Sequence, residues 1–449
     1  MGKLFGTDGI RSVANNYPMT PEMAVKFGRA VVSVFGEDGN RPKIVIGKDT
    51  RISGNMLEFA LVSGICSMGG DAYLTGILPT PGVALMVPST GADAGIVVSA
   101  SHNPFYDNGI KIFNKAGYKL SDETEVVIEK RVQDDTLVDQ CKSIQKTGSV
   151  YTIEDAGIRY ADFLKQTMPT AFSLEGLKIV LDCANGATYK IAPDLFRDLG
   201  AEVVALFVDP DGMNINDGCG SEHTEILCKK VIENRADIGL AFDGDGDRLI
   251  AVDENGNALT GDQILFIYAK FMKQNNLLKN NRVVSTVMSN MGLGVALKEM
   301  AIKHSITKVG DRYVMEQMVA SGTVIGGEDS GHMIFLNHHT TGDGILTALR
   351  LIEAVVSQSK TLSEIAQNMT VFPQVTINVD VKSKPDLETL PVIMDEIKRV
   401  ENHLGEEGRV LVRYSGTQPL CRVMVEGPTR KETDRLCRQI ADVVKATLG

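Results

Sequence analysis

Short apolar runs alternate with stretches of helical spacing along most of the chain. The apolar runs read KIVIG (43–47), AGIVVSA (94–100), LKIVLDC (177–183), IGLAF (238–242) and RVVSTV (282–287). Each run ends in a polar turn and is followed by a helical pattern, which is typical of parallel strands joined by helical crossovers. Thr20 and Pro21 predict a helix start, and Gly69 and Gly70 predict a helix end. The pattern indicates an α/β protein.

The C-terminal part follows a different pattern. QVTINVDVKSK (374–384), RVLVRYSG (409–416) and CRVMVEG (421–427) alternate at period 2 around a charged helical stretch, which favours an antiparallel sheet in a small α+β domain. Polar breaks lie near 133–150, 254–260 and 369–373. The predicted domains are three related α/β units at 1–150, 151–254 and 255–370, and the smaller unit at 371–449.

Composition excludes several classes of protein. With 449 residues and 43% hydrophobic content, the chain can bury a large core divided among several domains. The net charge of -11, without any Lys/Arg block, opposes nucleic-acid and membrane partners. Charges and glycines interrupt the apolar runs before the roughly 20 residues that a membrane span needs. The start of the chain lacks the apolar region of a secretory signal, and the seven cysteines form no C-x-x-C pair, so we expect a reducing, cytoplasmic location and no zinc site.

Three aspartates recur at every second position in DGDGDR. Gly244 and Gly246 between them permit the positive φ that would turn Asp243, Asp245 and Asp247 toward one point. Converging carboxylates need a cation, and hard oxygen ligands favour Mg²⁺ or Ca²⁺. An EF-hand fails because Arg248 stands where that loop needs glycine and because strands flank the motif. We therefore expect a magnesium site rather than a solvated turn.

A second polar turn, SASHNP (99–104), follows a buried strand, where α/β sheets place their ligands. If Ser101 carried a phosphoryl group, that group would give the metal a further oxygen. His102 would orient the phosphate or the serine, and Lys111 would hold phosphate or move a proton. Ser99 competes with Ser101 as nucleophile. A Ser-His hydrolase also stays open, although no G-x-S-x-G elbow surrounds either serine.

Two further turns have residues suited to a ligand. GGEDSGH (326–332) offers Glu328, Ser330 and His332, which suit sugar hydroxyls or an amino group; a plain tight turn is the alternative. RYSGTQPLCR (413–422) combines backbone N–H groups, hydroxyls and guanidinium groups into an anion cradle. The residues of this cradle are Arg413, Ser415, Gly416, Thr417 and Arg422.

Five motifs in this order resemble those of the α-D-phosphohexomutase superfamily along essentially the whole chain. They are FGTDGIR (5–11), SASHNP (99–104), DGDGDR (243–248), GEDSGH (327–332) and RYSGTQP (413–419). Within the superfamily, LFGTDGIR, TKVGDRYV (307–314) and PLCRVMVEG (419–427) are most similar to the bacterial members that act on glucosamine phosphates.

The resemblance implies a heart-shaped molecule in which three related α/β domains with mixed sheets and a smaller C-terminal domain surround a central cleft. It implies that Ser101 is a phosphoserine that also contributes to the Mg²⁺ site, whose other ligands would be Asp243, Asp245 and Asp247. Glu328 and Ser330 would hold sugar hydroxyls. The substrate's phosphate would be bound by Arg413, Ser415, Gly416 and Thr417. The positions that match those acting around the transferred phosphate and in proton transfer are Arg11, Lys111, Arg248 and His332.

The implied reaction interconverts glucosamine 6-phosphate and glucosamine 1-phosphate through a hexosamine 1,6-bisphosphate, with Lys111 or His332 as base. Its product would supply UDP-N-acetylglucosamine and cell-wall synthesis. The expected partner is a small phosphosugar, and a homodimer is compatible with a sequence that does not define the oligomeric state. Alternatives are a mutase for glucose or mannose phosphates, a non-catalytic phosphosugar sensor and a phosphatase.

Three positions depart from the superfamily pattern. Tyr414 and Gln418 replace the usual Pro and Glu of the phosphate loop, which puts the stiffness of that loop in question. Asp329 stands where Gln or Met is common, and we expect its side chain to point away from the sugar because it lies between the two contact residues.

Overall fold

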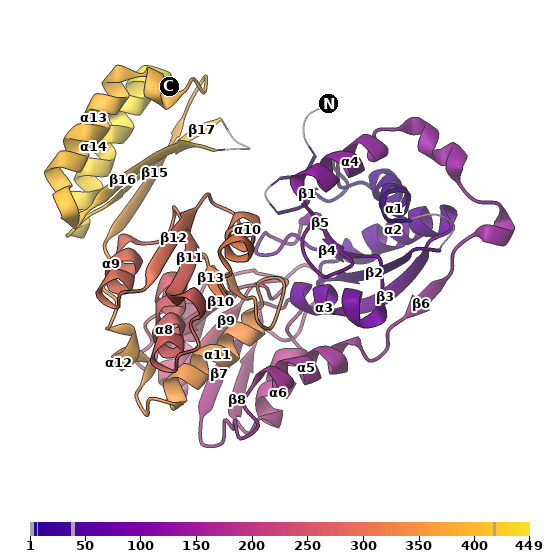
Figure 1. Ribbon diagram of the computed structural model, residues 1–449, viewed down its shortest axis with the longest axis horizontal. Coiled ribbons are helices and arrows are strands. Elements are labelled where there is room, and N and C mark those ends of the chain that lie inside the picture. Colours follow the sequence, from indigo (N-terminus) through magenta and orange to yellow (C-terminus); the bar gives the residue numbers. More distant parts are fainter. Residues whose placement is uncertain (1–3, 7, 37–40, 416–418) are drawn as a thin grey trace. The chain divides into compact units, whose positions relative to one another are not determined.

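The computed structural model describes residues 4–6, 8–36, 41–415 and 419–449. These residues form two compact units, Met1–Val287 with Lys303–Ala366 and Met288–Ile302 with Gln367–Gly449. Each unit is described by itself. Four sheets divide the chain in sequence order, three with crossover helices and one small C-terminal sheet (Figure 1). This four-domain α/β architecture is the one that the pattern predicted.

The first sheet has six strands in the order β1-β5-β4-β2-β3-β6. Strands β2, β3, β4 and β6 are mutually parallel, whereas β5 runs antiparallel to β4 and to β1, so the sheet is mixed rather than parallel throughout. The strands are β1 (Ile10–Val13), β2 (Lys43–Lys48), β3 (Asp71–Ile77), β4 (Ala94–Val98), β5 (Asp107–Asn114) and β6 (Val150–Thr152). The helices are α1 (Pro21–Phe35), α2 (Gly54–Ser67), α3 (Thr80–Thr90) and α4 (Asp122–Val132).

Helices α1 and α2 cross at two glycines. Thr20 caps α1 by accepting a hydrogen bond from Met23 N at 3.3 Å, as the sequence predicts. A Cβ atom at Gly28 would lie 2.3 Å from Leu61 O, and one at Gly64 would lie 2.2 Å from Val25 O. Because both backbones occupy the space of a methyl group, only glycine permits this helix pair to pack so closely.

The second and third sheets have four strands each. In the second, order β10-β9-β7-β8, the hairpin β9-β10 is antiparallel and the other pairs are parallel. Its elements are β7 (Lys178–Asp182), β8 (Glu202–Leu206), β9 (Ile238–Phe242), β10 (Leu249–Val252), α5 (Ala156–Thr167), α6 (Ile191–Asp198) and α7 (Glu225–Asn234). The third, order β12-β11-β13-β14, is parallel except at β14. Its elements are β11 (Arg282–Thr286), β12 (Lys303–Thr307), β13 (Ile325–Gly327), β14 (Met333–Phe335), α8 (Gly261–Gln274), α10 (Asp311–Ser321), α11 (Gly344–Val356) and α12 (Leu362–Ala366).

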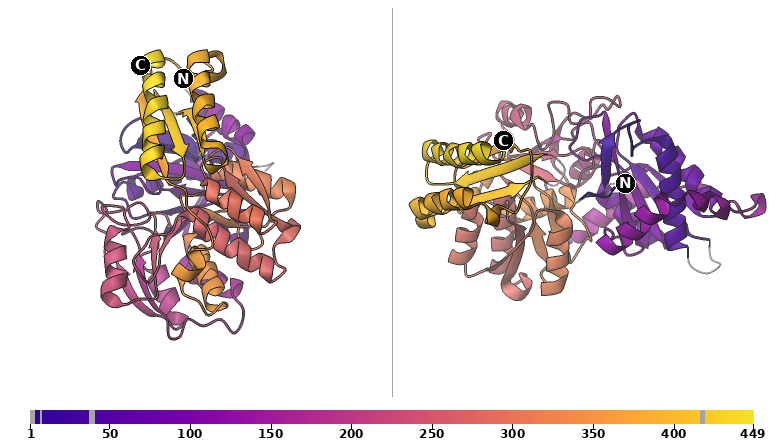
Figure 2. Two further views of the ribbon diagram at one scale, coloured as in Figure 1. Left: turned by 90° about the vertical axis from the view of Figure 1, so that its left-hand side faces the viewer. Right: turned by 90° about the horizontal axis from the view of Figure 1, so that it is seen from above.

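The smaller unit contains an antiparallel sheet in the order β15-β17-β16, as the period-2 pattern predicts. Its strands are β15 (Gln374–Asp380), β16 (Arg409–Tyr414) and β17 (Leu420–Glu426). Two long helices, α13 (Pro391–Leu404) and α14 (Arg430–Leu448), lie side by side on one face of the sheet (Figure 2). Helix α9 (Met291–Glu299) joins this unit because Met291 N donates to Glu426 Oε2 at 3.0 Å.

Within the part of the chain that the structure describes, no helix combines the length and the apolar character that crossing a bilayer requires.

We predict that Gly64→Ala destabilises the protein by about 1–3 kcal/mol, because the added methyl group overpacks the contact between α1 and α2. Gly157→Ala is the matched control, since a Cβ atom there lies at an ordinary 3.7 Å from Ile191 Cδ1 near the start of α5. This control should be neutral or stabilising, because alanine is the better helix former. Thermal unfolding of both variants measures the difference, and equal melting temperatures would contradict the proposed packing constraint.

Candidate active site

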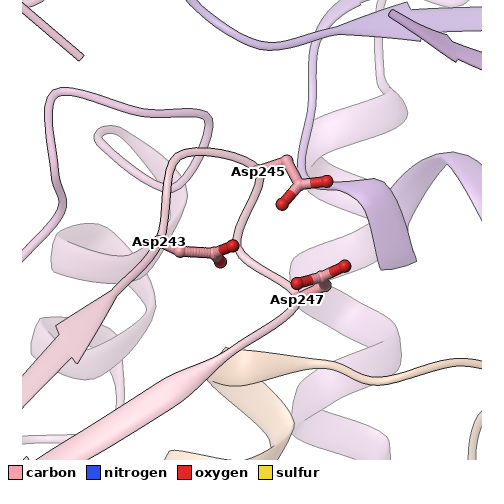
Figure 3. Close-up of side chains that lie close together, drawn as sticks. All are labelled: Asp243, Asp245 and Asp247. Atoms are coloured by element: carbon pink, nitrogen blue, oxygen red, sulfur yellow. The ribbon is translucent and has the colours of Figure 1, made fainter. Parts of the chain in front are cut away.

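The three aspartates of DGDGDR lie in the turn of the hairpin between β9 and β10. One carboxylate oxygen of each lies within 4.8 Å of the others, and all three residues are buried. Figure 3 shows the side chains of Asp243, Asp245 and Asp247 turned toward one another. The predicted convergence of these residues is therefore present, and we call them the aspartate cluster.

The two glycines of this turn have different roles. Gly246 has a φ of +71°, as predicted for both. Gly244 does not have a positive φ, so that part of the prediction is wrong. It is needed for close approach instead, because a Cβ atom there would lie 2.6 Å from Ser101 O. The glycine thus brings the loop of the first domain against the aspartate cluster.

The free oxygens of the aspartate cluster fit a cation. Oδ2 of Asp245 accepts from Thr80 Oγ1 at 2.6 Å and from Lys111 Nζ at 2.8 Å, whereas its buried Oδ1 has no hydrogen-bond partner among the described residues. Burial, followed by repulsion from Asp247 and Asp245, raises the pKa of Asp243 well above that of an ordinary aspartate. A divalent cation between the three carboxylates would remove this repulsion.

The side chain of Ser101 contacts the aspartate cluster directly. Its Oγ donates to Asp243 Oδ2 at 2.6 Å, although the two residues belong to different domains. Nδ1 of His102 lies 3.4 Å from the same hydroxyl. Burial, with help from Arg248 and Arg11, lowers the pKa of His102 to about 3, so its ring is neutral at neutral pH. The hydroxyl of Ser99, by contrast, donates to Asp49 at 2.5 Å, which favours Ser101 as the nucleophile.

Lys111, on β5, lies at the centre of the acidic groups. Its Nζ is 2.8 Å from Asp245 Oδ2, 3.0 Å from Asp247 Oδ2 and 3.1 Å from Asp8 Oδ2. Burial alone would lower the pKa of Lys111, but these three carboxylates raise it well above its usual value. A charged lysine therefore stands beside the aspartate cluster.

Four more contacts close this arrangement into a ring. Lys119 Nζ lies 2.5 Å from Asp8 Oδ1 and also pairs with Asp311, the first residue of α10. His332 Nε2 is 3.5 Å from Asp311 Oδ2, and its Nδ1 is 3.6 Å from Asp247 Oδ1. Although burial opposes it, Asp247 and Asp311 raise the pKa of His332. We call the six alternating charges the charge ring: Asp247, Lys111, Asp8, Lys119, Asp311 and His332.

The two predicted arginines flank the same groups. Arg11 pairs with Asp8, and Arg248 Nε lies 3.9 Å from Asp247 Oδ1 while its Nη1 is 3.4 Å from Glu222 Oε1. Nε of each arginine is buried and has no hydrogen-bond partner among the described residues. These N–H groups are available to an anion.

The sugar loop, residues 327–332, is a tight turn held by Glu328 N donating to His332 O at 3.0 Å. Oε1 of Glu328 accepts from Gly310 N at 3.0 Å, and the buried Oγ of Ser330 has no hydrogen-bond partner among the described residues. Asp329 interacts with Asp262 and Thr260 at the start of α8.

The cradle residues belong to the smaller unit. Arg413 on β16 is the register partner of Arg422 on β17, and both line a cavity of about 190 Å³ with Asn378 of β15. Burial and the neighbouring Arg422 lower the pKa of Arg413. Ser415 is described and buried, whereas the predicted Gly416 and Thr417, with the departure Gln418, lie outside the described residues.

Tyr414, the other departure from the phosphate-loop pattern, is the last residue of β16. It pairs in register with Cys421 of β17, and its side chain packs with the core under α13 and α14. Tyr414 therefore takes part in the ladder between β16 and β17.

The sequence prediction missed Asp8, Lys119 and Asp311 as site residues. Asp8 lies within FGTDGIR and Asp311 within GDR, two polar turns that the sequence shows plainly. Lys119 had no comparable signal, because its partner Asp311 is distant in sequence and only the fold brings them together.

Comparisons with known proteins agree with this geometry. Four family models match, described as phosphoglucomutase/phosphomannomutase α/β/α domain I at residues 2–139, domain II at 158–256, domain III at 260–372 and the C-terminal domain at 377–443. A phosphoglucomutase/phosphomannomutase family protein from Burkholderia thailandensis has a TM-score of 0.81 at 25% identity, covering 99% of this chain and 97% of that chain. The fold and site are those of a phosphohexomutase, an isomerase that moves a phosphoryl group within a sugar phosphate.

Relatives with higher sequence identity indicate the family within the phosphohexomutases. The phosphoglucosamine mutases of Syntrophus aciditrophicus and Syntrophobacter fumaroxidans are 60% and 59% identical to this chain, with both chains covered completely. The chain belongs to the phosphoglucosamine mutase family. An Aspergillus fumigatus N-acetylphosphoglucosamine mutase, solved in complex with GlcNAc-6P and magnesium, shares the fold with a TM-score of 0.69 at 18% identity, covering 99% of this chain and 96% of that chain.

The segment behind His332 contains a further buried acid. A Cβ atom at Gly342 would lie 2.3 Å from His332 Nε2, so the histidine ring rests against this glycine. The next residue, Asp343, caps α11: its Oδ1 accepts from Leu346 N at 2.9 Å and from Tyr160 Oη at 2.8 Å. Burial raises the pKa of Asp343 to about 7.

We predict that Asp343→Asn weakens the pH dependence of stability between about pH 4 and pH 7. In this window the folded protein keeps the proton of Asp343 while the unfolded chain loses it, so the free energy of unfolding falls as pH rises. The raised pKa corresponds to a loss of up to about 4 kcal/mol, which the variant lacks. Denaturant unfolding at pH 4.5 and 7.5 measures this difference, and parallel pH profiles would contradict the assignment.

Proposed function

We propose that the protein interconverts glucosamine 6-phosphate and glucosamine 1-phosphate, with Ser101 as the residue that carries and returns the phosphoryl group. The observation that supports this most strongly is the 2.6 Å contact of Ser101 Oγ with Asp243 in the aspartate cluster. It places a serine hydroxyl against a group of buried carboxylates that fits a divalent cation. The product would supply UDP-N-acetylglucosamine synthesis.

The aspartate cluster would hold Mg²⁺. Thr80 and Lys111 donate to Oδ2 of Asp245 and leave its Oδ1 without a hydrogen-bond partner among the described residues. Among the same residues, the ion-pair contacts of Asp247 Oδ1 are those with His332 at 3.6 Å and Arg248 at 3.9 Å. Hard carboxylate oxygens together with a phosphate oxygen are the ligands that Mg²⁺ prefers. When bound, the ion would offset the negative charge of the transferring phosphoryl group.

Cationic side chains of the protein would also stabilise the negative charge of the transferring phosphoryl group. Arg11 and Arg248 present buried Nε–H groups, and Lys111 supplies an ammonium group beside Asp245. Such preorganised donors contribute most of the catalysis in phosphoryl transfer, because there is little covalent chemistry for the protein to perform. His102, neutral and 3.4 Å from Ser101 Oγ, would orient the serine or its phosphate.

The sugar would lie against the sugar loop. The carboxylate of Glu328 and the free hydroxyl of Ser330 suit sugar hydroxyls, and His332 is the last residue of the same loop. His332 lies between Asp247 of the aspartate cluster and Asp311, and it would exchange the proton of the attacking hydroxyl, with Lys111 as the alternative.

The far phosphate of the substrate would bind the cradle of the smaller unit. Arg413 and Arg422 are paired in register, and their mutual repulsion favours an anion between them. Ser415, Gly416 and Thr417 would add hydroxyl and backbone donors. One cradle must accept either phosphate of the 1,6-bisphosphate, since that intermediate has to reverse its orientation before Ser101 takes back the second phosphoryl group.

We predict that phosphorus NMR of the purified protein, with Mg²⁺ and a trace of hexose 1,6-bisphosphate, shows conversion of glucosamine 6-phosphate to its 1-phosphate. Ser101→Ala should abolish this conversion, because the variant lacks the hydroxyl that would carry the phosphoryl group. Faster conversion of glucose or mannose 6-phosphate would contradict the substrate assignment. Stoichiometric release of inorganic phosphate would indicate a phosphatase instead.

Metal dependence gives a second test. We predict that chelation of divalent ions abolishes turnover and that Mg²⁺ restores it. Asp243→Asn should raise the Mg²⁺ concentration for half-maximal activity at least about tenfold, because one of three anionic ligands is lost. Asp217→Asn, an exposed aspartate upstream in the same domain, is the matched control and should leave the titration unchanged. Equal Mg²⁺ titrations for both variants would exclude the cluster as the metal site.

A further inference from the structure

The turn GKDTR (47–51) follows β2 and has no role in the reaction described above. Asp49 and Arg51 form an ion pair with Nε and Oδ2 2.9 Å apart, and both side chains have 0% exposure. Strand β2 lies next to β4 in parallel orientation, so this turn and the loop of Ser101 leave the same edge of the sheet. A fully buried pair at this edge calls for an explanation, because removing two charges from water is costly.

Asp49 fixes the amide of Ser101 through one intermediate. Its Oδ2 accepts from Ser99 Oγ at 2.5 Å, and Ser99 Oγ in turn accepts from Ser101 N at 2.9 Å. Its Oδ1 accepts from Arg51 N at 3.0 Å, which fixes the carboxylate on its own turn. Asp49 therefore positions the hydroxyl that holds the N–H of the reactive serine.

Arg51 fixes the carbonyl groups of the same loop. Its Nη2 donates to Ser101 O and Asn103 O, each at 2.8 Å, and its Nη1 donates to Pro104 O. From the second domain, Asn216 Nδ2 donates to the same two carbonyls, at 2.9 Å to Ser101 O and 3.0 Å to Asn103 O. The planar guanidinium thus holds three carbonyl groups of this loop in one geometry.

These hydrogen bonds hold Ser101, a residue whose backbone conformation is strained. Ser101 has a φ of +54°, a left-handed conformation that costs a non-glycine residue about 1–3 kcal/mol and persists only where the surroundings hold it. Both its N–H and its carbonyl are held by the contacts above. In this conformation its Oγ reaches Asp243 at 2.6 Å.

We propose that Asp49, Arg51 and Ser99 are positioning residues that hold Ser101 in its left-handed conformation and thereby align its oxygen for phosphoryl transfer. The proposal rests on the assignment of Ser101 as the phosphoryl carrier. All three side chains are buried behind the loop, so they act through Ser101 and not on the sugar. A misplacement of about 1 Å can slow a reaction about 100-fold, so their loss affects the transfer step rather than substrate binding.

Ser99→Ala tests the hydrogen bond that holds the amide of Ser101. Arg51→Lys tests the hydrogen bonds to the carbonyl groups of the loop, since lysine keeps the positive charge but lacks the planar guanidinium group. Each variant is loaded with phosphate from glucosamine 1,6-bisphosphate, and intact-mass analysis measures the phosphorylated fraction. The phosphoenzyme is then mixed rapidly with saturating glucosamine 6-phosphate, and the loss of enzyme-bound phosphate is followed in a single turnover.

We expect both variants to accept phosphate on Ser101 and then to transfer it about 10- to 100-fold more slowly, with kcat lowered by the same factor and KM changed less than about twofold. Ser285→Ala is the matched control: it removes another fully buried serine hydroxyl, which lies 2.8 Å from His304 Nε2. This control should transfer phosphate at the unmodified rate.

An unchanged single-turnover rate in Ser99→Ala and Arg51→Lys would overturn the proposal, as would a rise in KM alone or an equal loss in Ser285→Ala. Failure of the unmodified phosphoenzyme to pass phosphate to glucosamine 6-phosphate would have a different meaning. It would exclude Ser101 as the phosphoryl carrier. The proposed phosphoserine mechanism would then be wrong, and so would the positioning role that depends on it.

Discussion

Three buried carboxylates in one short turn repel one another, and the cationic side chains around them offset that repulsion. The aspartate cluster sits in the turn between β9 and β10, and that turn provides only the partly buried Arg248 as a counter-charge. Lys111 comes from the first domain and His332 from the third, so the charge of the turn is balanced only when three domains meet. The electrostatics of one loop therefore constrain how the first three domains pack.

The charge ring extends this balance beyond the reacting groups. Each cation contacts two or more carboxylates, and each carboxylate of the ring contacts two or more cations, so no buried charge is left without a partner. Removing one partner from such a network is far more costly than the net value of a single pair, because the remaining charge stays buried. The ring consequently ties the position of His332 to that of Lys111 through Asp8, Lys119 and Asp311.

Much of this arrangement was predictable from the sequence, because local chemistry determines it. The strands KIVIG and IGLAF, the cap at Thr20, the period-2 sheet near the C-terminus and the convergence of the three aspartates all follow from patterns within a few residues. The family resemblance added the expected roles of Ser101 and of the sugar loop, which stay predictions.

The remaining features depend on contacts that no local pattern encodes. The antiparallel direction of β5 depends on its place between β4 and β1 in the sheet. Gly244 is a glycine because the backbone of Ser101 passes close to it, not because of its own φ. Lys119 and Asp311 come into contact only in the folded chain.

The hydrogen bond from Ser101 to Asp243 also connects the two chemical states that the proposed reaction requires of the serine. A free hydroxyl donates a proton to Asp243 and so lessens the repulsion within the aspartate cluster. A phosphoserine has no such proton and adds about two negative charges at the same place. The cluster then contains more anionic groups than Lys111 and the two arginines can balance, and a divalent cation between them becomes favourable. Phosphorylation of Ser101 and binding of a cation should therefore strengthen each other, by the reciprocity that links any two ligands of one site.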